Sequence, residues 1–117
     1  MSFEHNGQTF TIKSTTEPVG GDKVSRSILG LTDEGENLIV FDGTVPETRQ
    51  SEILLHEIFH IMDMTLPEFM IHVLGQNFYG AAKANGLGID EWLRSLVDGE
   101  ATRDEADLIN EVSEEIS

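Results

Sequence analysis

The hydrophobic pattern of the chain changes its period once, at Gly43–Pro46. Before this point, Gln8–Lys13 alternates polar and apolar residues with the period of a half-buried strand, and Leu38–Phe41 is a short apolar run with the length of a strand. After it, apolar residues recur at helical spacing from Glu47 to Met64. Strands followed by helices indicate the α+β class.

The β-rich part, residues 1–43, is expected to form a small antiparallel meander. Three strands are expected in it, at Gln8–Lys13, near Val24–Leu31 and at Leu38–Phe41. The stretch 17–22 contains one Pro and two Gly residues and is expected to be a loop. The polar stretch 32–37 predicts a hairpin turn near Gly35.

Residues 46–85 are expected to form a helical hairpin. Pro46 suits the first turn of the first helix. Thr65 and Glu68 have the spacing of a capping box that starts the second helix, and the dipeptide Asn85-Gly86 is a natural stop for it. The acidic segment 86–117 is expected to hold short helices near Asp90–Val97 and, after a second capping-box pattern at Thr102–Glu105, from Arg103 to about Glu115.

The chain has 117 residues, the length of one domain, and a formal net charge of −15. Ten acidic and two basic residues between Asp90 and Ser117 give that segment a local charge of −8. This charge argues against nucleic acid and anionic membranes as partners, because binding phosphates requires Lys and Arg. The acidic segment is either a solvated surface or a region that docks on a basic partner.

The chain contains no cysteine, which excludes both disulfides and thiolate metal ligands. A cytoplasmic location fits this composition, and a secreted protein without cysteine would have the same composition. The first residues are too polar for a signal peptide, and no apolar run approaches the ~20 residues that a membrane span needs.

The sequence His56-Glu57-Ile58-Phe59-His60 is an HExxH pattern in the middle of the first predicted helix. Residues four apart lie on one helical face, so two imidazoles can bind one metal ion. Glu57 lies at the adjacent edge of that face, where its carboxylate can take a proton from a water that zinc has acidified. The pattern therefore predicts a zinc site with Glu57 as catalytic base; the alternative is a helix with two half-buried, hydrogen-bonded histidines.

Two histidines need a third protein ligand. Asp63 and Leu66 stand where metzincins have Gly and His, which excludes that class. Glu68 is the better candidate, because a tight turn brings it back beside the last turns of the first helix; its competing role is the cap of the second helix. His72 is an alternative ligand, a donor to the developing oxyanion, or a surface histidine. Asp63 either orients a ligand imidazole or is solvated, and Gly75 would let the two helices approach closely.

The stretch RQSEILLHEIFHIMD, followed by LPEFMIHVLGQNFYGAAKAN, resembles the minimal HExxH zincin-like proteins of bacteriophages, prophages and Firmicutes, which are distant relatives of the ImmA/IrrE metallopeptidases. The resemblance covers roughly Leu38–Asn85. The sequence departs from the family pattern at Phe69 and Ala84, where acidic residues are common.

The resemblance implies that His56, His60 and Glu68 bind zinc and that Glu57 is the general base. It also implies that the strand Leu38–Phe41 is the edge along which an extended peptide pairs. The function expected from these features is that of a small gluzincin-like zinc metallopeptidase of a bacterial or phage-infected cell. Its substrate would be a peptide or protein, by analogy a basic regulator. The alternative is a non-catalytic, acidic, zinc-containing interaction module.

Overall fold

The computed structural model describes residues 2–16, 30–33, 37–63 and 65–107. Five strands are present among them: β1 (Phe3–His5), β2 (Gln8–Ser14), β3 (Gly30–Asp33), β4 (Leu38–Phe41) and β5 (Val97–Glu100). The helices are α1 (Glu47–Met62), α2 (Glu68–Ala84) and α3 (Ile89–Ser95). A further short helical stretch covers residues 103–107. The predicted α+β class is confirmed.

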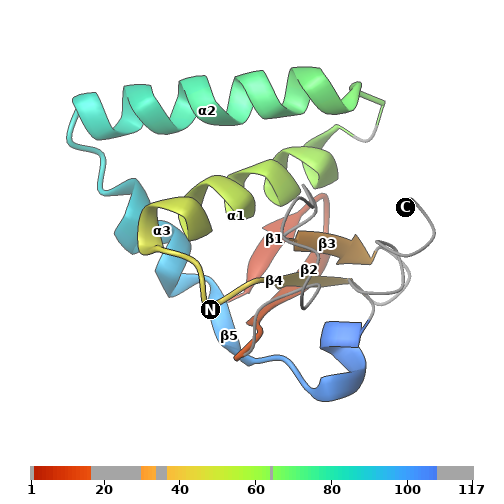
Figure 1. The fold of residues 1–117 in the computed structure, drawn as a ribbon. Coiled ribbons are helices and arrows are strands. Elements are labelled where there is room, and N and C mark those ends of the chain that lie inside the picture. Colours follow the sequence, from red (N-terminus) through yellow and green to blue (C-terminus); the bar gives the residue numbers. More distant parts are fainter. Residues whose placement is uncertain (1, 17–29, 34–36, 64, 108–117) are drawn as a thin grey trace.

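The helices α1 and α2 lie on one side of the sheet. Figure 1 shows α1 between the sheet and α2, so that α2 forms the outermost layer, while α3 lies beside the beginning of α1. Within the described ranges, no helix is long and apolar enough to cross a membrane. Because α1 is the middle layer, its residues contact the sheet on one side and α2 on the other.

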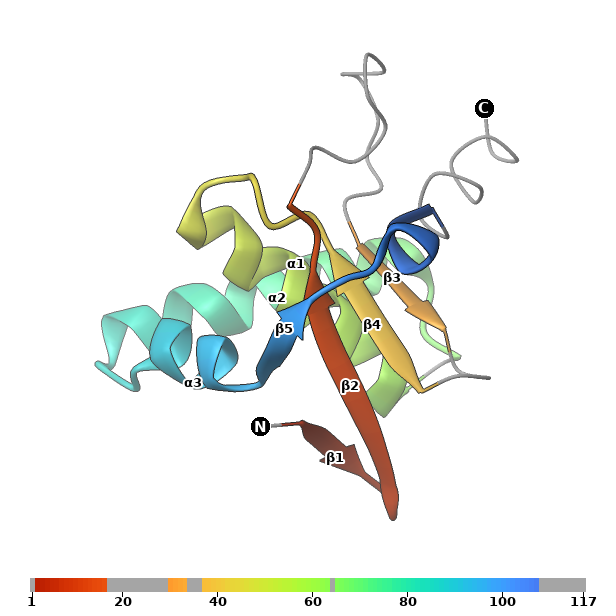
Figure 2. The ribbon, with the colours of Figure 1, turned by 90° about the horizontal axis from the view of Figure 1, so that it is seen from below.

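The sheet is mixed. Its strands run in the order β1-β2-β4-β3, with β5 paired to β2 along the same edge as β1 (Figure 2). The pairs β1–β2 and β3–β4 are antiparallel, whereas β2–β4 and β2–β5 are parallel. The predicted all-antiparallel meander is therefore wrong. The chain reaches β4 through the outer strand β3, and so β4 returns in the direction of β2 and pairs with it in parallel.

Several sequence predictions fall partly outside the described residues. The predicted loop at 17–22, most of the strand near Val24–Leu31 and the turn at Gly35 lie outside them, and so do Met64 and the end of the last predicted helix. Within the described residues, Thr32 and Asp33 continue β3 instead of forming the turn. Val97, which was expected to end a helix, begins β5.

The core lies between the sheet and α1. Alternate residues of β2 and β4, namely Phe10, Ile12, Ile39 and Phe41, belong to one buried cluster with the apolar residues of α1, which are Ile53, Leu54, Leu55, Ile58 and Ile61. Burying each of these large side chains contributes about 1.5–3 kcal/mol. The burial fixes α1 on the sheet and sets the direction in which its remaining residues point.

The second helix ends as the sequence predicts. Its C-cap is Asn85, and Gly86 has φ +65°, the left-handed conformation that favours glycine. The amide of Leu87 donates to the carbonyl of Ala82 and the amide of Gly86 to that of Lys83, which is the Schellman pattern. This turn leads directly into α3.

Candidate metal centre

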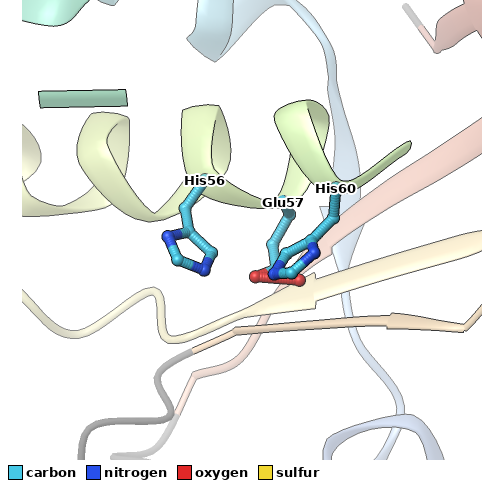
Figure 3. A group of neighbouring side chains, drawn as sticks. All are labelled: His56, Glu57 and His60. Carbon is cyan, nitrogen blue, oxygen red and sulfur yellow. The ribbon is translucent and has the colours of Figure 1, made fainter. Parts of the chain in front are cut away.

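Three side chains of the HExxH pattern project from the same side of α1 (Figure 3). One ligand atom from each of His56, Glu57 and His60 lies within 4.8 Å of the others. The two imidazoles meet edge to face with ring centroids 4.9 Å apart, and their side chains are 21% and 24% exposed. Glu57 is buried, with 7% of its surface exposed. The group is positioned to hold a metal ion.

A second carboxylate reaches this group from α2. Oε1 of Glu68 lies 2.5 Å from Nε2 of His56, and its Oε2 lies 2.8 Å from Nε2 of His60. One carboxylate thus spans the two imidazole nitrogens that face it. Glu68 itself is 68% exposed, so the contact lies at the edge of the molecule that is open to solvent.

The turn between α1 and α2 explains how Glu68 arrives there. Asp63 ends α1 in an extended conformation, and its Oδ1 accepts hydrogen bonds from the backbone amide and the hydroxyl of Thr65 at 3.0 and 2.6 Å. Pro67 is the N-cap of α2, with no side-chain capping bond. Glu68 is therefore the first residue of the helix, and the predicted capping box of Thr65 with Glu68 is wrong. Since its carboxylate is not used for capping, it can face the histidines.

The two helices pack closely beside the centre. A Cβ added to Gly75 would lie 3.8 Å from Cδ2 of Phe59 and 4.0 Å from the backbone nitrogen of His56. The rings of Phe59 and Phe78 meet edge to face at 5.9 Å, and Ile71 is completely buried. Gly75 therefore faces α1 directly, and the space there would accept a methyl group at ordinary van der Waals distance.

His72 and Asp63 take different positions relative to the centre. The ring of His72 lies 6.3 Å from that of His56, between centroids, and the residue is exposed. Asp63 is engaged by Thr65, and these hydrogen bonds hold its pKa below the ordinary value. The observed contacts of Asp63 belong to the turn, so its effect on the centre is to shape the connection that delivers Glu68.

The donor set fits a zinc ion. Two imidazole nitrogens and one carboxylate are the ligands of a His2Glu catalytic zinc site. In a tetrahedral site with metal–ligand bonds of about 2.0–2.2 Å, ligand atoms lie about 3.3 Å apart. The observed separations of 2.5 and 2.8 Å are shorter than this by less than about 1 Å. The exposed side chain of Glu68 has room to withdraw by that amount.

No protein-family model, curated protein or solved structure matches this chain.

The edge strand differs from the one that the family resemblance implied. β4 has β2 on one side and β3 on the other, so Leu38–Phe41 is an inner strand. Among the described strands, β3 has a single neighbour and is the outermost on that side of the sheet. α1 packs against both β3 and β4. Among the described strands, the outer one beside α1 is therefore Gly30–Asp33, where the resemblance implied Leu38–Phe41.

A polar cluster that the sequence did not predict joins the three helices near the other end of α1. Asp90 accepts hydrogen bonds from the hydroxyls of Ser51 and Tyr79 at 2.5 and 2.9 Å and from Nζ of Lys83 at 2.6 Å. The bond from Lys83, followed by that from Ser51, lowers the pKa of Asp90. Burial, together with the hydrogen bond to Asp90, raises the pKa of Tyr79. The cluster holds α2 and α3 on α1.

Proposed function

We propose that this protein is a zinc-dependent hydrolase of peptide bonds, with zinc held by His56, His60 and Glu68 and with Glu57 as the catalytic base. The observation that carries the proposal is the contact of one Glu68 carboxylate with Nε2 of both histidines, at 2.5 and 2.8 Å. The HExxH pattern alone supplies two ligands. The third comes from a different helix, which is the arrangement that a His2Glu site requires.

Glu57 and Glu68 have different environments, and this supports their different roles. Glu68 is largely exposed, and its carboxylate lies beside the Nε2 atoms of both imidazoles, where it can bind the same ion. Glu57 is buried and follows His56 directly on the helix, so its carboxylate lies beside the pair of imidazoles. Burial holds the carboxylate in one place, which favours proton transfer over a fixed short path.

In the proposed reaction, the protein's own groups bind the substrate and move one proton. Zinc, when bound, supplies a Lewis acid and lowers the pKa of water at neutral pH. The Glu57 carboxylate accepts the proton of the attacking water and returns it to the leaving amine. His56, His60 and Glu68 keep the reacting groups within reach of Glu57.

The substrate is proposed to be an extended peptide segment that adds to the outer edge of β3. Such pairing supplies backbone hydrogen bonds that do not depend on sequence. The formal charge of −15 favours a basic peptide, for instance a segment of a basic regulatory protein. The scissile bond of that peptide would then lie beside α1, because α1 packs on β3.

The test is hydrolysis of a mixed peptide library by zinc-loaded protein, followed by identification of new N-termini. We expect the wild type to cleave and Glu57→Gln to retain zinc but lose at least about a hundredfold in rate, the lower end of the contribution of general acid–base catalysis. Glu91→Gln, an exposed glutamate in the first turn of α3, is the matched control and should cleave like the wild type. Equal rates for wild type and Glu57→Gln would refute the mechanism. Stoichiometric zinc without any hydrolysis would instead support a non-catalytic interaction module.

A further inference from the structure

The outer face of α2 exposes an unusual number of large apolar side chains. Phe69, Met70, Val73 and Leu74 are 69%, 40%, 49% and 44% exposed. Phe69, Met70 and Val73 lie on the side of α2 away from Ile71, Gly75 and Ala82, which are buried against the rest of the molecule, and Leu74 lies at the edge of that side. α2 is also the outermost layer of the fold (Figure 1). A contiguous apolar face of this kind marks a surface that another molecule covers.

This face is bulky in its first half and flat in its second. Phe69, Met70, Val73 and Leu74 come first, and the same face continues as Asn77, Gly80, Ala81 and Ala84. Nothing lies within 4 Å of a Cβ added at Gly80. A face built in this way complements itself when a second copy runs antiparallel to the first. When two copies of α2 are aligned antiparallel over their whole length, Phe69 is level with the partner's Ala84, and Val73 is level with the partner's Gly80.

Charge also favours a second copy in the antiparallel direction. The chain has 22 acidic residues, yet α2 carries only Glu68 at one end and Lys83 at the other. Both already have partners within the chain, Glu68 with the histidines and Lys83 with Asp90. α2 is therefore a neutral surface on a molecule of charge −15, where two copies can meet without bringing acidic residues together. Antiparallel pairing places the Glu68 end of each α2 beside the Lys83 end of the other, whereas parallel pairing would place the two Glu68 ends together.

We propose that the protein forms a two-fold symmetric dimer through the outer face of α2, with the two copies of α2 antiparallel. A two-fold interface uses the same patch on both subunits and so requires a surface that complements itself. The inference does not depend on the proposed function. Glu68 points toward α1, away from this face, so dimerisation leaves the metal centre open.

Sedimentation velocity over a wide range of protein concentration tests the dimer. We expect the wild type to shift toward twice the monomer mass as concentration rises. Val73→Glu would bury an unpaired charge opposite the partner's Gly80 and should raise the dimer dissociation constant at least about tenfold. Gly80→Leu fills the hollow opposite the partner's Val73 and should have the same effect. Since its side chain enters open space and leucine favours helix, this variant should keep the fold.

Trp92→Glu is the control, because it introduces the same charge at a 43% exposed residue of α3 and should leave the dimer unchanged. Circular dichroism establishes that each variant is folded. A wild type that stays monomeric at every concentration would overturn the proposal, and so would a dimer insensitive to both α2 variants. Binding of a monomeric wild type to phosphatidylcholine vesicles would likewise overturn it, since a lipid surface would then be the occupant of the face.

Discussion

Oε1 of Glu68 lies 2.5 Å from Nε2 of His56, although the two residues are twelve positions apart and belong to different helices. The contact depends on the turn in which Asp63 accepts two hydrogen bonds from Thr65. It converts a two-histidine pattern on one helix into a three-residue donor set. The zinc site proposed for this protein is therefore a property of the helical hairpin as a whole.

Replacing Glu68 should weaken metal binding without unfolding the protein. Glu68→Gln keeps the size of the side chain but removes the charge, and the residue is largely exposed. We expect the affinity for zinc to fall at least about a hundredfold, since loss of even an outer hydrogen-bond partner of a ligand costs 10–100-fold. Competition with a chromophoric chelator measures the affinity. The matched control Glu91→Gln should bind like the wild type; equal affinities for both variants would remove Glu68 from the site.

His72 should be dispensable for binding zinc. Its ring lies 6.3 Å from that of His56 and is exposed, whereas Glu68 already contacts both histidines. We expect His72→Gln to change the binding free energy by no more than about 0.5 kcal/mol, roughly twofold in affinity, as for surface substitutions away from a contact. The same chelator competition gives this value. If His72→Gln lost zinc while Glu68→Gln kept it, the third ligand would be His72.

The two capping-box patterns show how far local sequence determines structure here. Thr102 and Glu105 form the predicted box, with hydrogen bonds of 2.8 and 3.2 Å in both directions. Thr65 and Glu68 have the same spacing and do not, because Asp63 accepts the bonds from Thr65 and the helix begins two residues later, after Pro67. The capping-box pattern considers only the four residues from Thr65 to Glu68, so it could not take the hydrogen bonds to Asp63 into account.

The strands that the prediction missed have different causes. The hairpin of β1 and β2 turns at Asn6 and Gly7, with φ of +50° and +77°. This Asn-Gly pair is a strong hairpin signal that the sequence does contain. β5 gives no such signal, since Val97–Glu100 has one apolar residue and pairs with a strand more than eighty residues away. Parallel and long-range pairing of this kind follows from the packing of the whole chain, and local periodicity does not reveal it.

The site residues were easier to predict than the contacts that hold the helices. The grouping of His56, Glu57 and His60 follows from helical spacing, and the approach of Glu68 follows from the expected helical hairpin. The cluster around Asp90 does not, because its members come from three helices and share no sequence pattern. Each of them alone is an ordinary polar residue on a predicted helix.

Asp90→Asn should destabilise the fold at neutral pH. It removes the charge that accepts bonds from Ser51, Tyr79 and Lys83, and hydrogen bonds to charged groups contribute about 1.5–3 kcal/mol. The pKa of Asp90 is lowered in the folded state, so its contribution is complete above the unfolded pKa of about 3.9 and is lost as pH falls through the folded value. Urea unfolding should thus show a gap between wild type and Asp90→Asn at neutral pH that narrows below about pH 4. Asp104→Asn, at an exposed residue, is the control; a gap independent of pH would contradict the assignment.

Two glycine-to-alanine substitutions should act in opposite directions. Gly75→Ala meets only contacts of 3.8 and 4.0 Å inside a helix, and should raise the free energy of unfolding by about 0.5–1 kcal/mol. Gly43→Ala would place its Cβ 2.4 Å from the carbonyl oxygen of Thr15 and 2.9 Å from Cβ of Ser14. It should lower the free energy by about 1–3 kcal/mol, as overpacking does. Urea denaturation compares both with the wild type, and destabilisation by Gly75→Ala would mean that the helices cannot accept a methyl group there.

The zinc content of the purified, reconstituted protein, measured by mass spectrometry under native conditions, tests the proposed metal centre. We expect one zinc per chain in the wild type, none in His60→Ala, and one in both Glu57→Gln and the matched control His5→Ala. Absence of zinc from the reconstituted wild type, or its retention by His60→Ala, would contradict the proposed metal centre.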